Sequence, residues 1–267
     1  MIRSIMLALS GSPFTPVASR YAVEIAAAHQ AKITGVSFLD VERLYRQMLP
    51  VGAVGYARAA TTETVTTARR RVAHAVTTLA EAAAEASVSH STIEREGDPI
   101  ELLIDEWRYH DLTVFGLRGL FDYRLVPEPE DALNRLVSAG VRPILAVGEQ
   151  YRPIQRILVA TSGSLTSAKV LKRYLQMGLW PQAEIHLVHF GPASTVMRRH
   201  LERTRAYCET YGAQVASMEA LGGHPRPDLL PYADRVNADL IVMGDSARSL
   251  LSRALFGDTA LHLVRNA

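Results

Sequence analysis

Small residues that follow two apolar runs are the part of this sequence best suited to bind a charged ligand. Gly244 follows the run Leu240–Met243, and a small-residue loop and a helical pattern then lead to Gly257. A similar run ends at Gly116, which is followed by Gly119. A strand that passes through a glycine loop into a helix exposes backbone N–H groups, which bind phosphate oxygens. Both segments are therefore candidate phosphate loops.

Hydroxyl side chains follow two other apolar runs. Each of these runs ends in Ser-Gly-Ser, once from Ser10 to Ser12 and once from Ser162 to Ser164. ATP-pyrophosphatase-type enzymes have a Ser-Gly-Gly-x-Asp-Ser loop after strand one, but the match here is limited to Ser-Gly-Ser. Turn formation and N-capping by Ser12 or Ser164 explain the same pattern without chemistry.

The sequence contains no set of residues with the spacing of a catalytic or metal site. His186 and His189 are three positions apart on a predicted strand, so they face opposite sides of it and cannot share a metal ion. The patterns His-Glu-x-x-His, Gly-x-Ser-x-Gly and Cys-x-x-Cys do not occur. Asp98 precedes Pro99 at a predicted helix start, where N-capping accounts for it. We therefore expect binding rather than catalysis.

The composition excludes several classes of protein. The 267 residues are 48% apolar and 21% charged with a net charge of +2, which is typical of a packed core. Cys208 is the only cysteine, so there is no intramolecular disulfide. No apolar run approaches the about 20 residues of a membrane span, and the N-terminus has no signal-peptide pattern. The basic run 69–71 is interpreted as a solvated helix face. We expect a cytoplasmic protein that binds neither membrane nor nucleic acid.

Predicted strands and helices alternate in two successive series. The first series has strands at 4–9, 33–39, 88–94, 112–115 and 143–147, helices at 14–30, 61–86, 98–109 and 130–139, and an irregular segment at about 40–60. The second has strands at 156–161, 184–190, 214–221 and 240–243, with helices at 164–177 and 194–211 and from 225. This alternation predicts an α/β protein with two doubly wound parallel sheets, in domains 1–150 and 151–267.

The spacing of matching residues supports a domain duplication. Ser12 and Ser164 are 152 positions apart, whereas Gly116 and Gly244 are 128 apart, so the first copy carries 24 additional residues. The irregular segment at 40–60 is the expected insertion. Pro143 lies 27 positions after Gly116, and the matching position in the second copy falls beyond the last residue. We therefore expect the second sheet to lack its fifth strand in the chain given, and the chain to stop before the true C-terminus, since an exposed apolar edge promotes aggregation.

These motifs together resemble the universal stress protein family in tandem form, over both halves almost end to end. The family has a first strand ending in Asp-Gly-Ser, a Gly-Asp-Pro-like helix start and a Gly-x2-Gly-x9-Gly-Ser/Thr loop after strand four. The resemblance implies a five-stranded parallel sheet of order 3-2-1-4-5 with helices on both faces. It also implies that members which bind ATP hold adenine near the ends of strands one and two and the phosphates on the glycine loop.

The first copy departs from the binding pattern in two places. Ser10 replaces the aspartate of strand one, as Ser162 does in the second copy. Gly116 and Gly119 are retained, but Pro129, which has no N–H to donate, stands where the last glycine is expected.

The second copy retains the spacing of the loop with two changes. The loop reads Gly244-x2-Ala247-x9-Gly257-Asp258, so the middle glycine is alanine and the Ser/Thr is aspartate. An aspartate repels phosphate unless a metal ion or Arg248 compensates for its charge. If one domain binds a nucleotide, the intact spacing favours the second.

The resemblance implies a specific set of site residues and ligands. The ligand would be ATP or AMP with Mg²⁺, and no residue is assigned a catalytic or metal-binding role. The residues that it places at the nucleotide are Ser162, Ser164, Phe190, Met243, Gly244, Ala247, Arg248, Gly257 and Thr259 in the second copy, and Ser10, Ser12, Phe38, Gly116 and Gly119 in the first.

The functional expectation is a stress-response or regulatory protein that acts by binding a ligand or another protein. The two domains are expected to pack through their fifth-strand edges and the neighbouring loops. Self-association and an unidentified protein partner are also expected. Two alternatives remain: a weak ATPase or adenylate-handling enzyme, and a protein-binding adaptor that holds no nucleotide.

Overall fold

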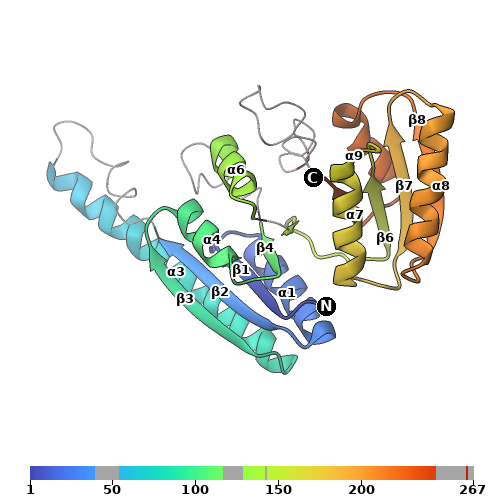
Figure 1. The fold of residues 1–267 in the computed structure, drawn as a ribbon. Coiled ribbons are helices and arrows are strands. Elements are labelled where there is room, and N and C mark those ends of the chain that lie inside the picture. The colour runs from blue at the N-terminus through green and yellow to red at the C-terminus, as the bar shows by residue number, and fades with distance from the viewer. Residues whose placement is uncertain (40–53, 117–128, 142, 245–262, 264–267) are drawn as a thin grey trace. The chain divides into compact units, whose positions relative to one another are not determined.

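The computed structural model describes residues 1–39, 54–116, 129–141, 143–244 and 263 of the chain (Figure 1). Five parallel strands form the first sheet in the order β3-β2-β1-β4-β5, as predicted. Its strands are β1 (Ser4–Leu9), β2 (Lys32–Leu39), β3 (His90–Glu96), β4 (Leu112–Phe115) and β5 (Ile144–Ala146). The inner strands β1 and β4 are almost entirely buried, because helices cover both of their faces.

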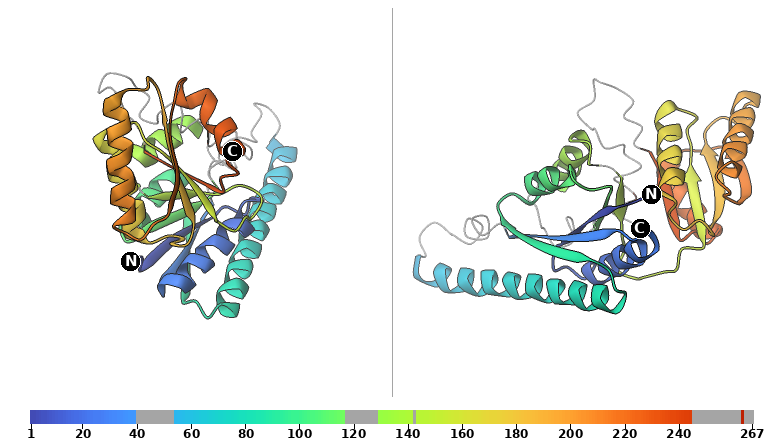
Figure 2. Two further views of the ribbon diagram at one scale, coloured as in Figure 1. Left: turned by 90° about the vertical axis from the view of Figure 1, so that its right-hand side faces the viewer. Right: turned by 60° about the horizontal axis from the view of Figure 1, so that its bottom comes forward.

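Among the described residues, four helices cover the first sheet as two layers (Figure 2). They are α1 (Thr15–His29), α3 (Val54–Glu85), α4 (Pro99–Trp107) and α6 (Pro129–Ser138). Helix α1 packs beside α3 on one face, and α4 packs beside α6 on the other. Helix α3 begins at Val54, seven residues before the predicted start, so the irregular segment is shorter than expected. The residues that precede the predicted start include several alanines, which favour helix strongly enough to extend it.

The second sheet has four parallel strands among the described residues, in the order β8-β7-β6-β9. Its strands are β6 (Arg156–Ala160), β7 (Glu184–Phe190), β8 (Val215–Leu221) and β9 (Leu240–Met243), with helices α7 (Leu165–Met177), α8 (Thr195–Glu209) and α9 (Pro225–Arg235). This is the 3-2-1-4 part of the first sheet's order, so the predicted repetition of the fold is confirmed. Helix α9 packs through Leu229 and Tyr232 on a core that includes Leu158 and Val188.

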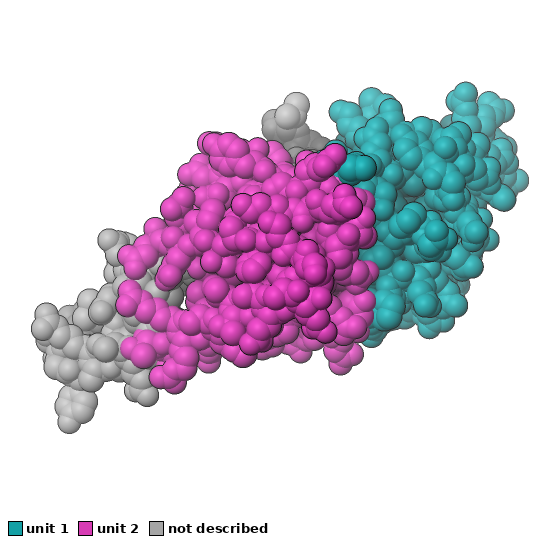
Figure 3. Space-filling model, turned by 90° about the horizontal axis from the view of Figure 1, so that it is seen from below, with its two compact units in different colours: residues 1, 152–267 teal, residues 2–151 magenta. Residues whose placement is uncertain are grey.

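The chain divides into two compact units (Figure 3). Residues 2–151, drawn in magenta, are called the first unit in the text, and residue 1 with 152–267, drawn in teal, the second unit. The last residue of the first unit is held by side-chain contacts within that unit. The hydroxyl of Tyr151 donates a hydrogen bond of 2.8 Å to Glu24, and the guanidinium of Arg20 lies 3.5 Å from the centre of the Tyr151 ring. This cation–π contact fixes the chain where it leaves the first unit.

An aspartate before the fourth strand makes the same hydrogen bonds in both units. Oδ2 of Asp111 accepts from the backbone N–H groups of Arg3 at 2.8 Å and Ser4 at 3.1 Å. Asp239 accepts at 2.9 Å from the two N–H groups at the start of β6. The two aspartates are 128 positions apart, as are Gly116 and Gly244. Each carboxylate therefore joins strands one and four at their amino ends.

His110, next to one of these aspartates, makes the stability of the first unit dependent on pH. Its Nδ1 lies 2.7 Å from Oγ of Ser4. Burial lowers the pKa of His110 from its ordinary value, and the carboxylates of Glu106 and Asp111 offset only part of this. Between the lowered pKa and about 6.5 the unfolded chain binds more protons, so stability falls as the pH falls through this window.

We expect His110→Gln to flatten this dependence. Urea unfolding midpoints measured between pH 5 and 8 should fall toward acid more steeply in the natural chain than in the variant. Equal slopes in the two proteins would show that His110 does not contribute.

Candidate functional site

A pocket lies in the second unit at the carboxyl ends of β6, β7 and β9. In open α/β sheets this is the end at which ligands bind. Five of the residues predicted from the sequence line it, namely Ser162, Ser164, Phe190, Met243 and Gly244. The other lining residues are Ala160, Thr161, Thr166, Ser167, Val188, Pro225 and Leu229. The pocket has an apolar wall from β7, α9 and β9 and a wall of hydroxyl groups from the turn after β6.

The hydroxyl wall is an ordered network at the start of α7. Oγ of Ser162 donates to Oγ of Ser164 at 2.9 Å, and Oγ of Ser164 accepts from the N–H of Ser167 at 3.2 Å. Thr161 donates to Oγ of Ser167 at 3.2 Å. Ser164 is thus the N-cap of α7, as predicted, while Ser162 is exposed. The network fixes these hydroxyls at the edge of the pocket, where they can donate to or accept from a ligand.

Phe190 both lines the pocket and packs on the core. Its ring meets the ring of Tyr232 edge to face, with centroids 5.9 Å apart. Arg235 lies over the other ring of this pair, 4.4 Å from the centre of Tyr232. Burial raises the pKa of Tyr232, and the nearby carboxylate of Glu219 raises it further. Phe190 can therefore pack on the core with one part of its ring and stack on a ligand in the pocket with another.

The glycine after β9 lies against helix α7. A Cβ atom added to Gly244 would lie 3.1 Å from Cγ2 of Val170 and 3.5 Å from the carbonyl oxygen of Thr166. Glycine at this position therefore allows the end of the strand to pack closely on the helix.

The turn after strand one and the glycine after strand four form a corner in each unit, and in the first unit side chains close this corner. Oγ of Ser10 lies 2.8 Å from Oγ of Ser12, which is buried. Ser12 does not cap α1, contrary to one of our interpretations. The residue at the N-cap is Phe14, without a side-chain cap, because the helix begins two positions later than in the second unit. A Cβ atom added to Gly116 would lie 2.3 Å from Cβ of Phe14, so Phe14 packs directly on that glycine.

Several predicted site residues lie outside the part of the chain that the structure describes. They are Ala247, Arg248, Gly257, Thr259 and Gly119, and for Phe38 only the backbone in β2 is described. Conversely, sequence reasoning missed Thr161, Thr166, Pro225 and Leu229. Pro225 and Leu229 could have been found, because the Gly-x-Pro start of α9 repeats the Gly-Asp-Pro start of α4 at the same end of the sheet.

The capping predicted for Asp98 is confirmed, and a histidine caps the matching helix of the second unit. Oδ1 of Asp98 accepts from the N–H of Ile100 at 2.8 Å. In the second unit Nδ1 of His224 accepts from the N–H of Arg226 at 3.3 Å.

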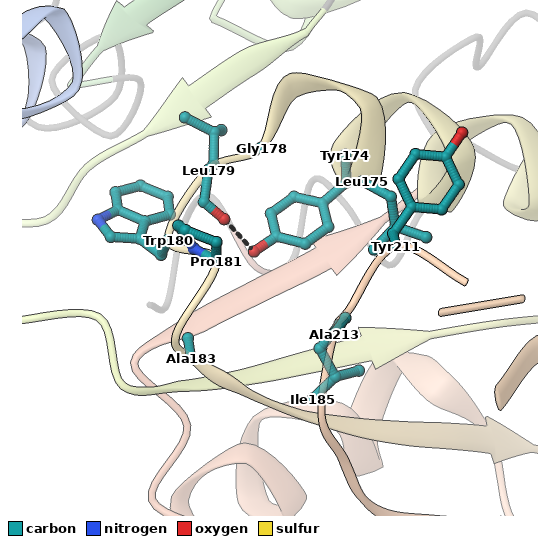
Figure 4. Close-up of a pocket in the computed structure, with 10 residues that line it drawn as sticks. All are labelled: Tyr174, Leu175, Gly178, Leu179, Trp180, Pro181, Ala183, Ile185, Tyr211 and Ala213. Carbon is teal, nitrogen blue, oxygen red and sulfur yellow. Dashed lines mark hydrogen bonds between the residues drawn. The ribbon is translucent and has the colours of Figure 1, made fainter. Parts of the chain in front are cut away.

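A second pocket lies at the opposite, amino end of β7 (Figure 4). Tyr174 is at its centre and donates a hydrogen bond of 2.7 Å to the carbonyl oxygen of Leu179. Burial raises the pKa of this tyrosine. Trp180 and Tyr211 lie at the two sides of the view, with their rings well apart. None of the predicted site residues lines this pocket, so it is not our candidate site.

The described residues contain no group of three or more His, Cys, Asp or Glu side chains that could hold a metal ion. The two histidines of β7 contact different groups, since His186 Nδ1 lies 2.8 Å from Oγ of Ser217 and His189 Nδ1 lies 3.0 Å from the carbonyl oxygen of Thr161. Nor does any helix in the described ranges combine the length and the apolar character that crossing a bilayer would require.

Comparison with known proteins gives consistent results for both units. A universal stress protein of Methanocaldococcus jannaschii is 24% identical over 132 residues, which are 42% of this chain and 77% of that protein. One of Synechocystis sp. is 24% identical over 197 residues, 73% of this chain and 67% of the relative. The crystal structure of a universal stress protein from Archaeoglobus fulgidus covers 99% of this chain and 93% of its own, with a TM-score of 0.66 and 16% identity, a likeness of fold.

The model of the Universal stress protein family matches this sequence twice, over residues 1–136 and again over residues 153–267. The two matches correspond to the two sheets and together span most of the chain. The protein therefore belongs to the Universal stress protein family.

Proposed function

We propose that this universal stress protein acts by binding an adenine nucleotide, ATP or AMP, in its second domain. One observation carries the proposal. The pocket at the carboxyl ends of β6, β7 and β9 brings together Ser162, Ser164, Phe190, Met243 and Gly244, which the resemblance to the family places at a nucleotide. We propose domain boundaries near residue 150, and we extend to this protein the self-association and cytoplasmic location that the resemblance implies.

The two walls of the pocket suit the two parts of a nucleotide. Val188, Phe190 and Leu229 offer an apolar surface for a planar base. The hydroxyls of Ser162 and Ser164 offer neutral donors and acceptors for ribose or phosphate oxygens. None of the described residues that line the pocket is acidic, so they offer no carboxylate ligand to a Mg²⁺ ion that enters with the nucleotide.

Calorimetric titration with ATP and AMP, each with and without Mg²⁺, tests the proposal. Ser164→Ala removes a pocket hydroxyl and the cap of α7, whereas the matched control Ser194→Ala removes only the cap of α8, whose Oγ accepts from the N–H of Met197 at 3.0 Å. Both variants should lose about 1 kcal/mol of stability. Only Ser164→Ala should weaken nucleotide binding, by about 3- to 10-fold. Absence of heat with every nucleotide would refute the proposal.

An adaptor that holds no nucleotide is the second candidate, and the packing of Gly244 on α7 favours it. In that case no nucleotide would raise the melting temperature, while the chain would still associate with itself or a partner. The enzymatic alternative predicts release of inorganic phosphate from ATP. Binding without phosphate release would exclude the ATPase and leave nucleotide sensing.

A further inference from the structure

We propose that Phe14 fills, in the first domain, the space that is an open ligand pocket in the second, so that the chain has one ligand site rather than two. The residue at this position of the turn after strand one would decide whether a domain binds. The identity of the ligand rests on the proposed function, but the difference between the two domains does not.

The residue of the second copy that corresponds to Phe14 is a threonine. The offset of 152 that relates Ser12 to Ser164 relates Phe14 to Thr166. Thr166 is partly exposed and lines the pocket. Phe14 is only 1% exposed, so its larger ring lies fully within the corresponding corner.

The contacts of the two glycines show what occupies each corner. At Gly116 the nearest atoms to an added Cβ are Cβ and Cγ of Phe14, at 2.3 and 2.9 Å. At Gly244 they are Cγ2 of Val170 at 3.1 Å and only the backbone oxygen of Thr166. The side chain at the threonine position therefore leaves open the space that the phenylalanine fills.

Other positions of the corner differ in the same direction. Leu9, which is fully buried, corresponds to Thr161 of the hydroxyl network. Phe115, 4% exposed, corresponds to Met243, which is partly exposed and lines the pocket. The corner of the first domain thus keeps the hydroxyls of Ser10 and Ser12, but apolar side chains fill it at these other positions, whereas the corner of the second domain is open.

Filling the pocket of the second domain should abolish binding without unfolding it. We expect the natural chain to bind one ATP or AMP per chain in calorimetric titration. Thr166→Phe should weaken binding at least 10-fold while its urea midpoint stays the same or rises. The matched control Thr195→Phe places the same ring on the exposed first turn of α8, outside the pocket, and should bind like the natural chain. A stoichiometry of two, or normal binding by Thr166→Phe, would overturn the inference.

Emptying the corner of the first domain gives a readout that does not depend on nucleotide. Phe14→Ala should lower the melting temperature by about 10 °C, because truncating a buried phenylalanine leaves a cavity. Saturating benzene, which enters dry apolar cavities, should then raise the melting temperature of this variant but not of the natural chain or Thr166→Phe. Phe14→Leu leaves a smaller cavity and replaces the alanine variant if that does not fold.

The two arms separate the failure of each proposal. If the natural chain binds no nucleotide, the proposed function fails and the benzene arm alone decides whether Phe14 fills the corner. If nucleotide binds but benzene has no selective effect on the truncated variants, the inference about Phe14 fails and the proposed function stands.

Discussion

Replacing Gly116 by alanine should lower the free energy of unfolding by about 3 kcal/mol, whereas the same change at Gly244 should cost about 1 kcal/mol or less. Neither glycine has a left-handed φ, so the difference comes from packing alone. The new methyl group would lie 2.3 Å from Cβ of Phe14, an atom close to the backbone that cannot rotate away. At Gly244 the nearest atom, 3.1 Å away, is a terminal methyl of Val170, which can shift by a few tenths of an ångström.

Tryptophan fluorescence during urea unfolding measures the two effects separately. The sequence has two tryptophans, Trp107 in the first unit and Trp180 in the second. Trp180→Phe and Trp107→Phe backgrounds therefore leave one reporter for each unit. Equal losses of stability at the two glycines would contradict the packing difference on which both this prediction and the closed first corner depend.

Sequence reasoning predicted most of the fold because the signals of an α/β chain are local. Apolar runs followed by Ser-Gly-Ser or a single glycine end at strand boundaries, and the offsets of 152 and 128 relate one sheet to the other. What it missed depends on packing. Asp111 and Asp239 could be recognised in the sequence as a repeated residue, but their shared role could not. Each accepts hydrogen bonds from N–H groups of a strand more than 80 positions away.

The candidate site was predicted in part, for the same reason. Ser162 and Ser164 stand where the chain turns from strand to helix, and Gly244 directly follows strand β9, so local pattern was enough to find them. Thr166 and Phe14 are on the first turns of helices, where the pattern gives no sign of what their side chains contact. Only the three-dimensional structure brings that turn beside the glycine of strand four and shows that Phe14 is buried where Thr166 is partly exposed.

Cys208 should react with iodoacetamide at pH 8 at least about 100-fold more slowly in the folded protein than in guanidinium. The residue is fully buried in α8, and burial raises the pKa of its thiol to about 11. At pH 8 such a thiol is about 0.1% thiolate, whereas an unperturbed one is about a quarter thiolate. The buried thiol would then react only when the second unit opens, so the slow rate of alkylation would measure that opening.

Mass spectrometry of alkylation over time measures this rate, and the chain offers a control on the same helix. Glu202 is exposed, so a Cys208→Ala, Glu202→Cys variant carries one thiol on the outer face of α8 and should react at nearly the unfolded rate. Because the raised pKa belongs to the folded state, the folded chain binds more protons above about pH 8.5, and its stability should fall as the pH rises further. Fast alkylation of Cys208 in the native protein would mean that α8 opens readily, and the hydroxyl network beside it could not then be a preorganised site.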